Sequence, residues 1–364
     1  MKQKVLLLRA NPRKTGFTQR LGDWFLAGLR EAGAKVRDVD VPALGLNPCL
    51  GCFHCWLVEP GQCVHGDAMS AQLEYIREAT VVVCATPIYY YSMSAYLKTY
   101  FERTFPLAKP GIQVSGKGLT RNSIRHLADW KDKKFISIIT GALRDPEAYR
   151  PATETFQLIA DSLDMELGGQ LTRPECYLLD YPLSKPKTLK RVEAAFIQAG
   201  REAGTTGRLS TETMQAAALP LAADLNHYRT YSNYYWTWAN DMGEEALEPS
   251  NVQRRVATDA RILMREMVRS HDAKATARVK AVLQFEFPDR QLVYSVRLNA
   301  DHCELAETGV ANPDLRVTCN STVWSAVFMR QLDLREALRN GSLRLAGDKS
   351  LFTRLDRFFP PPSE

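Results

Sequence analysis

The chain has 364 residues, of which 45% are apolar and 24% are charged, a composition typical of a globular protein. At roughly 100–200 residues per domain, this length favours two domains. The net charge of +6 is scattered without basic runs, which argues against a nucleic-acid partner and is compatible with anionic small ligands.

The first 200 residues alternate between strand and helix patterns. Residues 4–10 (KVLLLRA) predict a strand buried on both faces. This apolar run is too short for the 7–15-residue core of a signal peptide, and no stretch approaches the roughly 20 residues of a membrane span. We therefore expect a cytoplasmic protein without an integral membrane segment.

Further strands and helices follow in regular alternation. Strands are predicted at 35–41, 80–86, 134–140 and, as a short piece, 176–179. Helices are predicted at 18–32, 69–79, 93–103, 151–165 and 189–202. This alternation predicts an α/β fold, a doubly wound parallel sheet with right-handed crossovers.

The pattern changes after residue 204. Residues 205–254 predict a helical, aromatic-rich linker between the domains. Residues 255–364 open with a basic amphipathic helix at 256–269 and continue as a smaller α+β domain. Its strands are predicted at 282–287, 292–298, 302–306, 315–319 and 343–345, and its later helices at 321–330 and 334–338. The sequence thus predicts a first domain over residues 1–204 and a second over 255–364.

The loop after the first strand has the features of a phosphate site. It consists of Asn11, Pro12, Arg13, Lys14, Thr15, Gly16, Phe17 and Thr18. Free backbone N–H groups and the helix dipole favour an anion at such a helix start. Arg13 and Lys14 add positive charge, and Gly16 lets the backbone approach a ligand closely. A plain strand-to-helix turn with a threonine cap fits the same residues.

Two more loops follow strands at the sheet edge where ligands of doubly wound folds bind. The first of the two consists of Pro87, Ile88, Tyr89, Tyr90, Tyr91, Ser92, Met93 and Ser94. Three consecutive tyrosines fit a ligand mouth better than a core strand, because their hydroxyls need polar partners. The other loop carries the small residues Thr140, Gly141 and Ala142, which would let a flat ring approach.

These loops resemble those of the NADPH-dependent FMN reductase family and the related iron–sulfur flavoproteins. The family's phosphate-loop pattern S-P-R-x-x-G-x-T appears as NPRKTGFT, with Asn11 in place of serine. The ring-loop pattern appears as ATPIYYYSMSAYLKTYFER, with Glu102 in place of aspartate, and the third loop has Ala142 in place of a glycine. The resemblance covers about residues 1–200 and implies a flavodoxin-like domain whose three loops bind FMN.

The same resemblance implies an enzyme, an FMN-dependent NAD(P)H oxidoreductase that passes electrons from nicotinamide to a small-molecule acceptor. The flavin would carry the chemistry, so no catalytic side chain is expected. Small flavin reductases often complete their site with a second subunit, which implies a homodimer or higher homo-oligomer.

Four cysteines form a compact motif: Cys49, Cys52, Cys55 and Cys63. In a reducing compartment such a cluster indicates metal or redox chemistry. Four thiolates suit a 4Fe–4S cluster or zinc. The iron–sulfur flavoproteins carry a similar arrangement at this position, which implies a 4Fe–4S cluster. Two alternatives remain open: a loop packed beside the flavin through Phe53 and Trp56, and a reactive thiol or thiol pair that serves the flavin.

Residues of about 258–360 resemble the sterol-carrier-protein-type lipid-binding domain. The resemblance lies in LQFEF (283–287), ANPDLRVTCNSTVW (311–324) and GSLRLAGD (341–348). It implies an apolar tunnel for an acyl chain or a sterol. Candidate lining residues are Leu283, Phe285, Leu315, Val317, Val323, Trp324, Val327 and Phe328, which equally fit an ordinary domain core.

The fusion suggests an apolar or quinone-like electron acceptor. One alternative is a non-enzymatic electron carrier or redox sensor in which flavin and iron–sulfur centres exchange electrons with a partner. Another is that the C-terminal domain serves only for dimerisation or docking.

Overall fold

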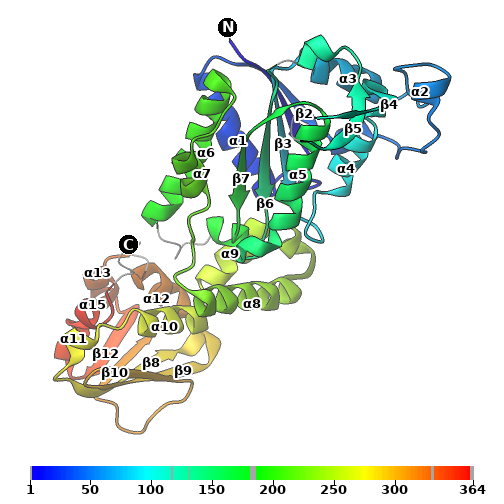
Figure 1. Cartoon of the computed structure of the whole chain (residues 1–364). Helices are drawn as coiled ribbons and strands as arrows, with labels where there is room; N and C mark the ends of the chain where they lie inside the picture. The colour runs from blue at the N-terminus through cyan, green and yellow to red at the C-terminus, as the bar shows by residue number, and fades with distance from the viewer. Residues whose placement is uncertain (1, 116–117, 131, 181–185, 329–331, 361–364) are drawn as a thin grey trace. The chain divides into compact units, whose positions relative to one another are not determined.

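The computed structural model describes residues 2–115, 118–130, 132–180, 186–328 and 332–360 (Figure 1). The chain divides into two compact units, residues 1–179 with 187–223 and residues 180–186 with 224–364. Within the described ranges, no helix has both the length and the apolar character needed to cross a bilayer.

The first unit is built on a five-stranded sheet in the order β2-β1-β3-β6-β7, and all its neighbours pair in parallel. The strands are β1 Lys4–Arg9, β2 Lys35–Asp40, β3 Val81–Pro87, β6 Lys134–Thr140 and β7 Glu166–Arg173. The order reverses between β1 and β3, which is where a doubly wound sheet opens a ligand crevice at its carboxyl edge. The predicted flavodoxin-like α/β fold is confirmed.

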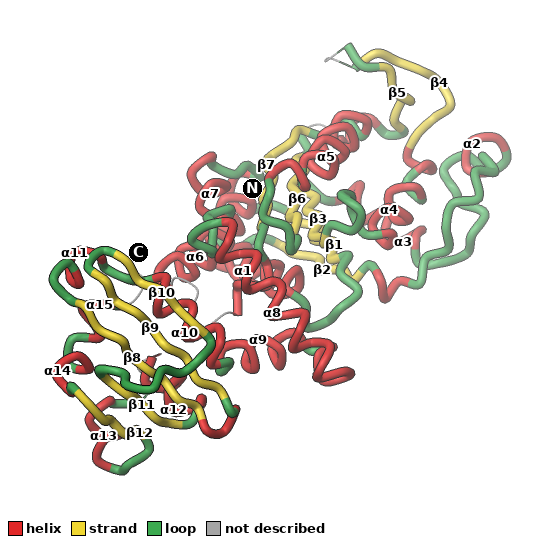
Figure 2. The backbone as a smooth tube through the Cα atoms, turned by 90° about the horizontal axis from the view of Figure 1, so that it is seen from below, coloured by secondary structure: helices red, strands yellow, loops and turns green. Residues whose placement is uncertain are grey.

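Helices cover both faces of this sheet (Figure 2). The helices are α1 Phe17–Glu31, α2 His54–Leu57, α3 Met69–Glu78, α4 Ala95–Glu102, α5 Arg150–Ser162, α6 Pro186–Thr206 and α7 Thr211–Ala217. Short 3₁₀ turns are η1 Pro42–Leu44, η2 Phe105–Leu107, η3 Leu127–Trp130, η4 Pro146–Ala148 and η5 Cys176–Asp180.

One face carries a continuous apolar core under α3, α4 and α5. Alternate residues of a strand share a face, so Leu6 and Leu8 of β1 lie in this core together with Val82 of β3. The helices contribute Met69, Leu73, Ile76, Leu97, Tyr100, Ala152, Phe156 and Ala160. Burial of this face anchors the helices that lead into and out of the site loops.

On the other face, α1 and α6 approach each other at glycines. A Cβ atom at Gly28 would lie 1.9 Å from the carbonyl oxygen of Ile197, and one at Gly200 would lie 2.0 Å from that of Phe25. Real Cβ atoms do not come this close to backbone, so the two helices pack at this distance only because both residues are glycine.

One prediction about the edge of this sheet is wrong, and one strand there was not predicted. Residues 176–179 form no strand but part of the 3₁₀ turn η5, and the fifth strand is β7, Glu166–Arg173. This strand reads ELGGQLTR and lies at the sheet edge, where buried residues are interrupted by partly buried ones, so it lacks the continuous apolar run of the inner strands. Its glycines are needed for packing, because a Cβ at Gly168 would lie 2.2 Å from the carbonyl oxygen of Gly207.

A hairpin outside the main sheet was not predicted. Strands β4 Ala108–Val114 and β5 Thr120–Ile124 pair antiparallel, with an irregularity between Ala108 and Ile112. The Pro110–Gly111 pair at that irregularity reads as a loop in the sequence. The hairpin lies beside the cysteine segment (residues 49–63), where Arg125 Nη2 donates to the carbonyl oxygen of Cys55 at 3.5 Å.

The second unit is an α+β domain, as predicted. Its sheet has the order β10-β9-β8-β11-β12, built from β8 Lys280–Phe287, β9 Leu292–Asn299, β10 His302–Ala306, β11 Leu315–Cys319 and β12 Leu343–Gly347. The helices are α8 Leu225–Met242, α9 Pro249–Ala257, α10 Ala260–Arg269, α11 Ala273–Thr276, α12 Ser321–Phe328, α13 Leu334–Arg339, α14 Lys349–Phe352 and α15 Leu355–Phe358, with 3₁₀ turns η6 Gly243–Leu247 and η7 Pro288–Arg290. The last predicted residues of the helix at 321–330 lie outside the described ranges.

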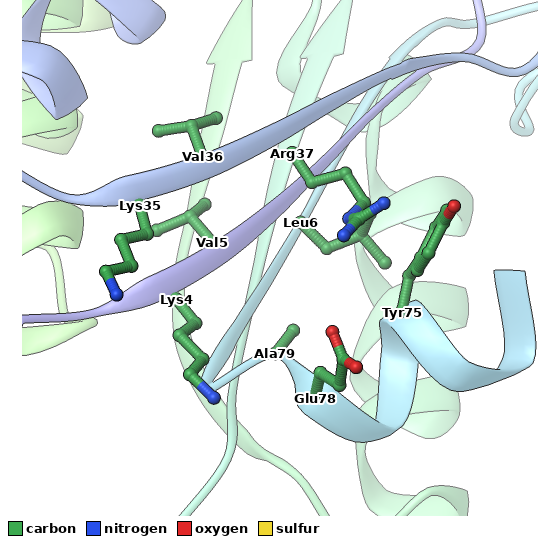
Figure 3. A pocket seen from close by; sticks show the side chains of 9 residues that line it. All are labelled: Lys4, Val5, Leu6, Lys35, Val36, Arg37, Tyr75, Glu78 and Ala79. Carbon is green, nitrogen blue, oxygen red and sulfur yellow. The ribbon is translucent and has the colours of Figure 1, made fainter. Parts of the chain in front are cut away.

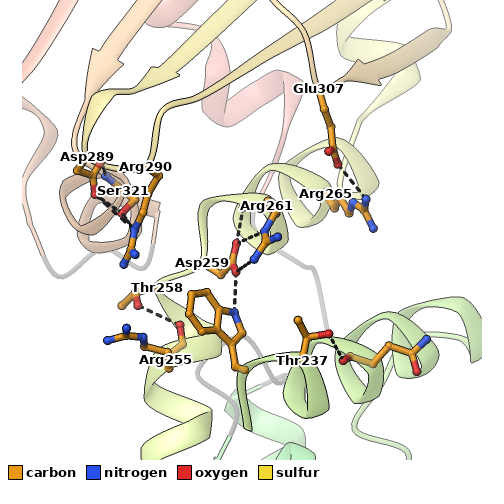
Figure 4. A network of polar contacts seen from close by, with 12 residues as sticks. Thr237, Arg255, Thr258, Asp259, Arg261, Arg265, Asp289, Arg290, Glu307 and Ser321 are labelled. Atoms are coloured by element: carbon orange, nitrogen blue, oxygen red, sulfur yellow. Dashed lines mark hydrogen bonds and ion pairs between the residues drawn. The ribbon is translucent and has the colours of Figure 1, made fainter. Parts of the chain in front are cut away.

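The single helix predicted at 256–269 is two helices. Thr258 and Asp259 separate α9 from α10, and the Asp259 carboxylate accepts the backbone N–H of Arg261 at 2.8 Å (Figure 4). This is the cap that starts a new helix. Asp259 also accepts the indole N–H of Trp238 at 2.6 Å, which ties α8 to the break. Periodicity alone did not reveal the break, because Val256, Ala260 and Leu263 keep the helical spacing across it.

The glycine contact between α1 and α6 yields a stability prediction. Gly28→Ala should lower the free energy of unfolding of the first unit by about 2–3 kcal/mol, because backbone must move to admit the Cβ. That loss exceeds the roughly 1 kcal/mol of helix propensity that alanine gains.

Urea unfolding measures this difference. Gly66→Ala is the control, because a Cβ at Gly66 meets nothing within 4 Å, and we expect it to stay within about 0.5 kcal/mol of the parent. Equal stabilities for the two variants would show that the helices separate without penalty.

Candidate functional site

The three predicted site loops converge at the carboxyl edge of the parallel sheet. The loop from Asn11 follows β1, the loop from Ile88 follows β3, and Gly141 follows β6. The Ser94 hydroxyl donates to the carbonyl oxygen of Ala10 at 2.7 Å, and the Ile88 N–H donates to that of Thr140 at 2.8 Å. These bonds join all three loops across the point where the strand order reverses.

The first loop leaves a helix start open for a ligand. The residue before α1 is Gly16, so no side chain caps the helix and its first backbone N–H groups keep their donor capacity. Asn11 is buried; its amide donates to the carbonyl oxygen of Arg13 at 2.7 Å, while its Oδ1 has no hydrogen-bond partner among the described residues. A buried acceptor of this kind calls for a donor from a ligand or water.

The charged residues of this loop have different surroundings. Lys14 forms an ion pair with Asp40 at the end of β2. The Arg13 side chain is exposed and forms no ion pair within the described part of the chain. Thr18 is buried and shares a short hydrogen bond between its hydroxyl and that of Thr140, which joins the first loop to the third. Arg13 is therefore the loop's available cation, and Thr18 is a positioning group.

The second loop ends in a strained turn of tyrosines. Tyr89 and Ser92 exchange backbone hydrogen bonds at 2.9 and 3.1 Å, and the two residues between them have positive φ, 47° at Tyr90 and 64° at Tyr91. Asn and Gly usually occupy such turns, and a bulky residue there costs on the order of 1–2 kcal/mol. The Tyr90 side chain is 99% exposed. The strained turn therefore holds the Tyr90 ring in solvent.

The third loop packs directly against the second, where Gly141 lies close to Ile88. A Cβ at Gly141 would lie 2.8 Å from Cγ1 of Ile88 and 2.7 Å from the Tyr149 hydroxyl. The Gly141 carbonyl also accepts the N–H of Cys176 at 3.1 Å. Gly141 is thus required by crowding, and Cys176 fills space behind it. Burial raises the pKa of the Cys176 thiol to about 12, so this cysteine stays protonated.

Charged residues behind the third loop were not identified from the sequence. Arg173, at the end of β7, is fully buried and donates to the carbonyl oxygens of Pro174 at 2.6 Å and Ala217 at 2.9 Å. Glu175 is also buried and pairs with Arg144 at 2.9 Å. The sequence predicts no strand at residues 166–173, so it did not indicate that Arg173 lies at the carboxyl end of the sheet.

The cysteine segment gathers its four thiols in one region. Burial raises the pKa of Cys55, and the nearby thiols of Cys63, Cys49 and Cys52 raise it further. The N–H of Gly51 lies 3.5 Å from Sγ of Cys49. Across the described ranges, no three Cys, His, Asp or Glu side chains are already arranged as a metal site.

A buried ion pair anchors this segment to the site helix α4. Arg103, directly after α4, is 1% exposed and binds both oxygens of Asp67, with N–O distances of 2.7 and 2.9 Å. It also donates to the carbonyl oxygen of Asn47 at 2.7 Å. Burial alone raises the pKa of Asp67, but hydrogen bonds from Arg103 and the Met69 N–H outweigh it and hold this pKa below its usual value. The sequence signal was the arginine that closes the ring-loop pattern.

Phe53 and Trp56, the two bulky residues of the cysteine segment, pack against each other and against Phe105. The Trp56 ring lies 5.2 Å from Phe53 and 5.5 Å from Phe105, and its indole N–H donates to the carbonyl oxygen of Phe105 at 2.9 Å. Trp56 thereby ties α2 to the turn after α4.

Two separate segments of the chain match two family models. Residues 3–143 match the NADPH-dependent FMN reductase family. Residues 261–360 match the SCP-2 sterol transfer family. Both predicted resemblances are confirmed for these segments.

The chain is also similar to known proteins over its first half. It is 31% identical over 103 residues to an iron–sulfur flavoprotein of Archaeoglobus fulgidus, covering 28% of this chain and 46% of that protein. It is 27% identical over 180 residues to one of Methanocaldococcus jannaschii, covering 47% and 92%. The chain thus spans about half the length of the first relative and most of the second. The structure of an FMN-dependent NADH-azoreductase from Bacillus anthracis aligns with a TM-score of 0.43 at 12% identity, over 56% of this chain and 99% of that one.

The Arg103–Asp67 pair yields a pH-dependent prediction. Asp67→Asn should lower the free energy of unfolding at pH 7 by about 3 kcal/mol, because it leaves the buried guanidinium without a carboxylate. The folded pKa of Asp67 is depressed, so its contribution is complete above the unfolded value near 3.8 and is lost as the pH falls through the folded pKa. The stabilities of parent and variant should therefore converge in acid.

Urea titrations at pH 7 and near pH 3 measure both effects. Glu74→Gln is the control, since Glu74 is exposed beside Arg77 and should contribute about 0.5 kcal/mol or less. A difference between parent and Asp67→Asn that does not change with pH would contradict the prediction.

Proposed function

Because residues 3–143 match the NADPH-dependent FMN reductase family and residues 261–360 match the SCP-2 sterol transfer family, we propose that this chain is an FMN-dependent NAD(P)H oxidoreductase fused to a lipid-binding-type domain. FMN, when bound, accepts hydride from the nicotinamide and passes electrons to a small-molecule acceptor. The observation that carries this proposal is the convergence of three loops at the reversal of strand order, with an uncapped helix start among them.

The residues at this edge suit the parts of FMN. The open start of α1 and the exposed Arg13 suit a phosphate. The unpartnered Oδ1 of Asn11 suits a hydroxyl donor of the ribityl chain. The rigid loop Pro87–Ser94 and the crowded Gly141 provide backbone and small surfaces against which a flat ring can lie. The proposed FMN-binding residues are those of the three loops.

The chain's own contribution to this chemistry is positioning. Hydride transfer between two bound rings needs alignment and a site protected from water, and it needs no protein nucleophile. The hydrogen bonds of Ser94 and Thr18 hold the loops in place.

An apolar or quinone-like acceptor fits the tyrosines of the second loop. Tyr89, Tyr90 and Tyr91 are all at least half exposed at the predicted mouth, where their rings can contact a flat apolar molecule. The SCP-2 match supports an apolar ligand for the second domain. Five of its candidate lining residues, Leu283, Phe285, Leu315, Val317 and Trp324, are fully packed core residues, whereas Val323, Val327 and Phe328 on α12 are only partly buried. These three are the side chains best placed to meet a lipid.

A homo-oligomer fits the apolar surface of the cysteine segment and of the region that includes the β4–β5 hairpin. The exposed large apolar residues there are Leu50, Phe53, Leu57, Val58, Val64, Phe105, Ile112, Val114 and Leu119. Exposed apolar residues concentrated in neighbouring segments are typical of interaction surfaces, and a second copy of the chain would bury them.

The second candidate function is an iron–sulfur flavoprotein that carries electrons or senses redox state. It is favoured by the spacing of four cysteines within residues 49–63 and by the N–H group of Gly51, which lies 3.5 Å from Sγ of Cys49. Hydrogen bonds to sulfur are a regular part of cluster environments. The relatives from both archaea bear the name iron–sulfur flavoprotein.

Flavin binding tests the leading proposal. Arg13→Gln should raise the Kd for FMN about tenfold, because one charge-assisted bond to phosphate is lost. Arg30→Gln, an exposed arginine in the last turn of the same helix, should stay within about twofold of the parent. Quenching of FMN fluorescence measures both constants.

Two results would argue against the proposal. A chain that binds no FMN would refute the flavin site. An FMN-loaded chain that is not bleached by NADPH under anaerobic conditions would favour the electron carrier over the enzyme.

Iron analysis tests the cysteines. If they hold a 4Fe–4S cluster, anaerobically purified protein should contain about four iron and four sulfide per chain. Cys63→Ser should then lose most of the iron, whereas Cys303→Ser, which changes a lone cysteine in β10, should keep it. Protein that binds FMN but contains no iron would leave the packed loop or the reactive thiols as the explanation of the motif.

A further inference from the structure

A groove of about 450 Å³ lies at the amino ends of β1 and β2, at the opposite edge of the sheet from the three site loops (Figure 3). Its lining residues are Lys4, Val5, Leu6, Lys35, Val36, Arg37, Tyr75, Glu78 and Ala79. This volume lies in the range of small-molecule sites. The proposed flavin chemistry uses none of these residues.

The parallel register explains why the groove is basic. Lys4 pairs with Lys35, and Leu6 pairs with Arg37, and residues paired in this way have side chains on the same face. The same register places Leu8 beside Val39 at the other end of the strands, inside the apolar core. The face shared by β1 and β2 therefore changes from apolar to cationic towards its amino end.

The positive charge of this groove is largely uncompensated. Within the described ranges, none of the cationic groups of Lys4, Lys35 and Arg37 forms an ion pair, and the lining contains one carboxylate, that of Glu78. Lys4 and Lys35 occupy paired positions on neighbouring strands, so their positive charges repel each other.

The neighbouring Lys133 is affected by the same charge. Its amine donates to the carbonyl oxygens of Arg77 and Ala79. Burial lowers the pKa of Lys133 to about 8, and repulsion from Arg77 and Lys4 contributes to the shift.

One wall of the groove is flat. The Arg37 guanidinium stacks over the Tyr75 ring, with 3.5 Å from its central carbon to the ring centroid. Figure 3 shows this pair facing the groove from β2 and α3. Leu6 and Ala79 lie at the base of the groove and are almost fully buried, so they expose little surface. An aromatic ring would therefore lie against the stacked pair while an acidic group reaches the lysines.

We propose that this groove is a second ligand site, which binds a small aromatic acid with its carboxylate or sulfonate between Lys4 and Lys35 and its ring against the Arg37–Tyr75 pair. The ligand supplies the negative charge that the paired lysines lack. Its site is separate from the flavin edge, so its occupancy does not depend on the proposed oxidoreductase activity.

Equilibrium dialysis of 2-naphthoate against the full chain with saturating FMN tests this proposal. Lys4→Gln/Lys35→Gln should weaken 2-naphthoate binding at least tenfold. 2-Naphthamide has the same ring but no charge, and it should bind the parent at least tenfold more weakly than 2-naphthoate does. The control Lys109→Gln/Lys190→Gln removes two exposed lysines from the same unit and should bind like the parent. All variants should unfold at the parent's temperature and keep their affinity for FMN.

Two further arms distinguish an aromatic acid from a simple anion. Tyr75→Leu should weaken 2-naphthoate severalfold and leave inorganic sulfate binding unchanged. The proposal is overturned if 2-naphthoate does not bind at millimolar concentration, if the lysine variant binds it as the parent does, or if sulfate binds as tightly as 2-naphthoate. Because FMN affinity is measured separately, failure here is distinguishable from failure of the flavin proposal.

Discussion

The parallel pairing of β1 with β2 on one side and β3 on the other is the constraint on which the first unit depends. It reverses the strand order at β1, so the loops after β1 and β3 leave the sheet as neighbours and the Ser94 hydroxyl can reach the carbonyl oxygen of Ala10. The same register aligns Leu8 with Val39 in the core and Lys4 with Lys35 at the opposite edge. One pairing pattern thus produces an apolar centre and a distinct chemical surface at each end.

Helix α4 connects two of the functional regions. It begins at Ser94, which fixes the tyrosine loop, and ends at Arg103, which holds the cysteine segment through Asp67. Eight helical residues span about 12 Å, so the two regions sit at the ends of one short rod that is buried along one side by Leu97 and Tyr100. The proposed flavin and the cysteines are therefore held in a defined relation, whether or not the thiols bind a cluster.

The strained tyrosine turn illustrates how local preference and tertiary structure oppose each other. Positive φ at Tyr90 and Tyr91 is unfavourable for the isolated segment. The turn persists because both its ends are fixed, one by Ile88 against Gly141 and the other by Ser94. Such strain is stored where a surface must present particular side chains, and here it presents aromatic rings at the edge proposed for the acceptor.

The amino-acid sequence by itself determined most of the strands and helices, because buried strands such as β1 and β6 are continuous apolar runs and α1 repeats its apolar residues at the helical period. It also identified the site loops, because Asn11–Thr18 and Pro87–Ser94 are contiguous and carry their chemistry within a few residues. Only the tertiary structure decided the edge strand β7, whose Gly168 is explained by a contact with Gly207. It alone paired Arg103 with Asp67, 36 residues apart, and Lys4 with Lys35 on neighbouring strands. Local pattern records which face of an element is buried, whereas pairing between distant residues depends on register and packing, which no single segment encodes.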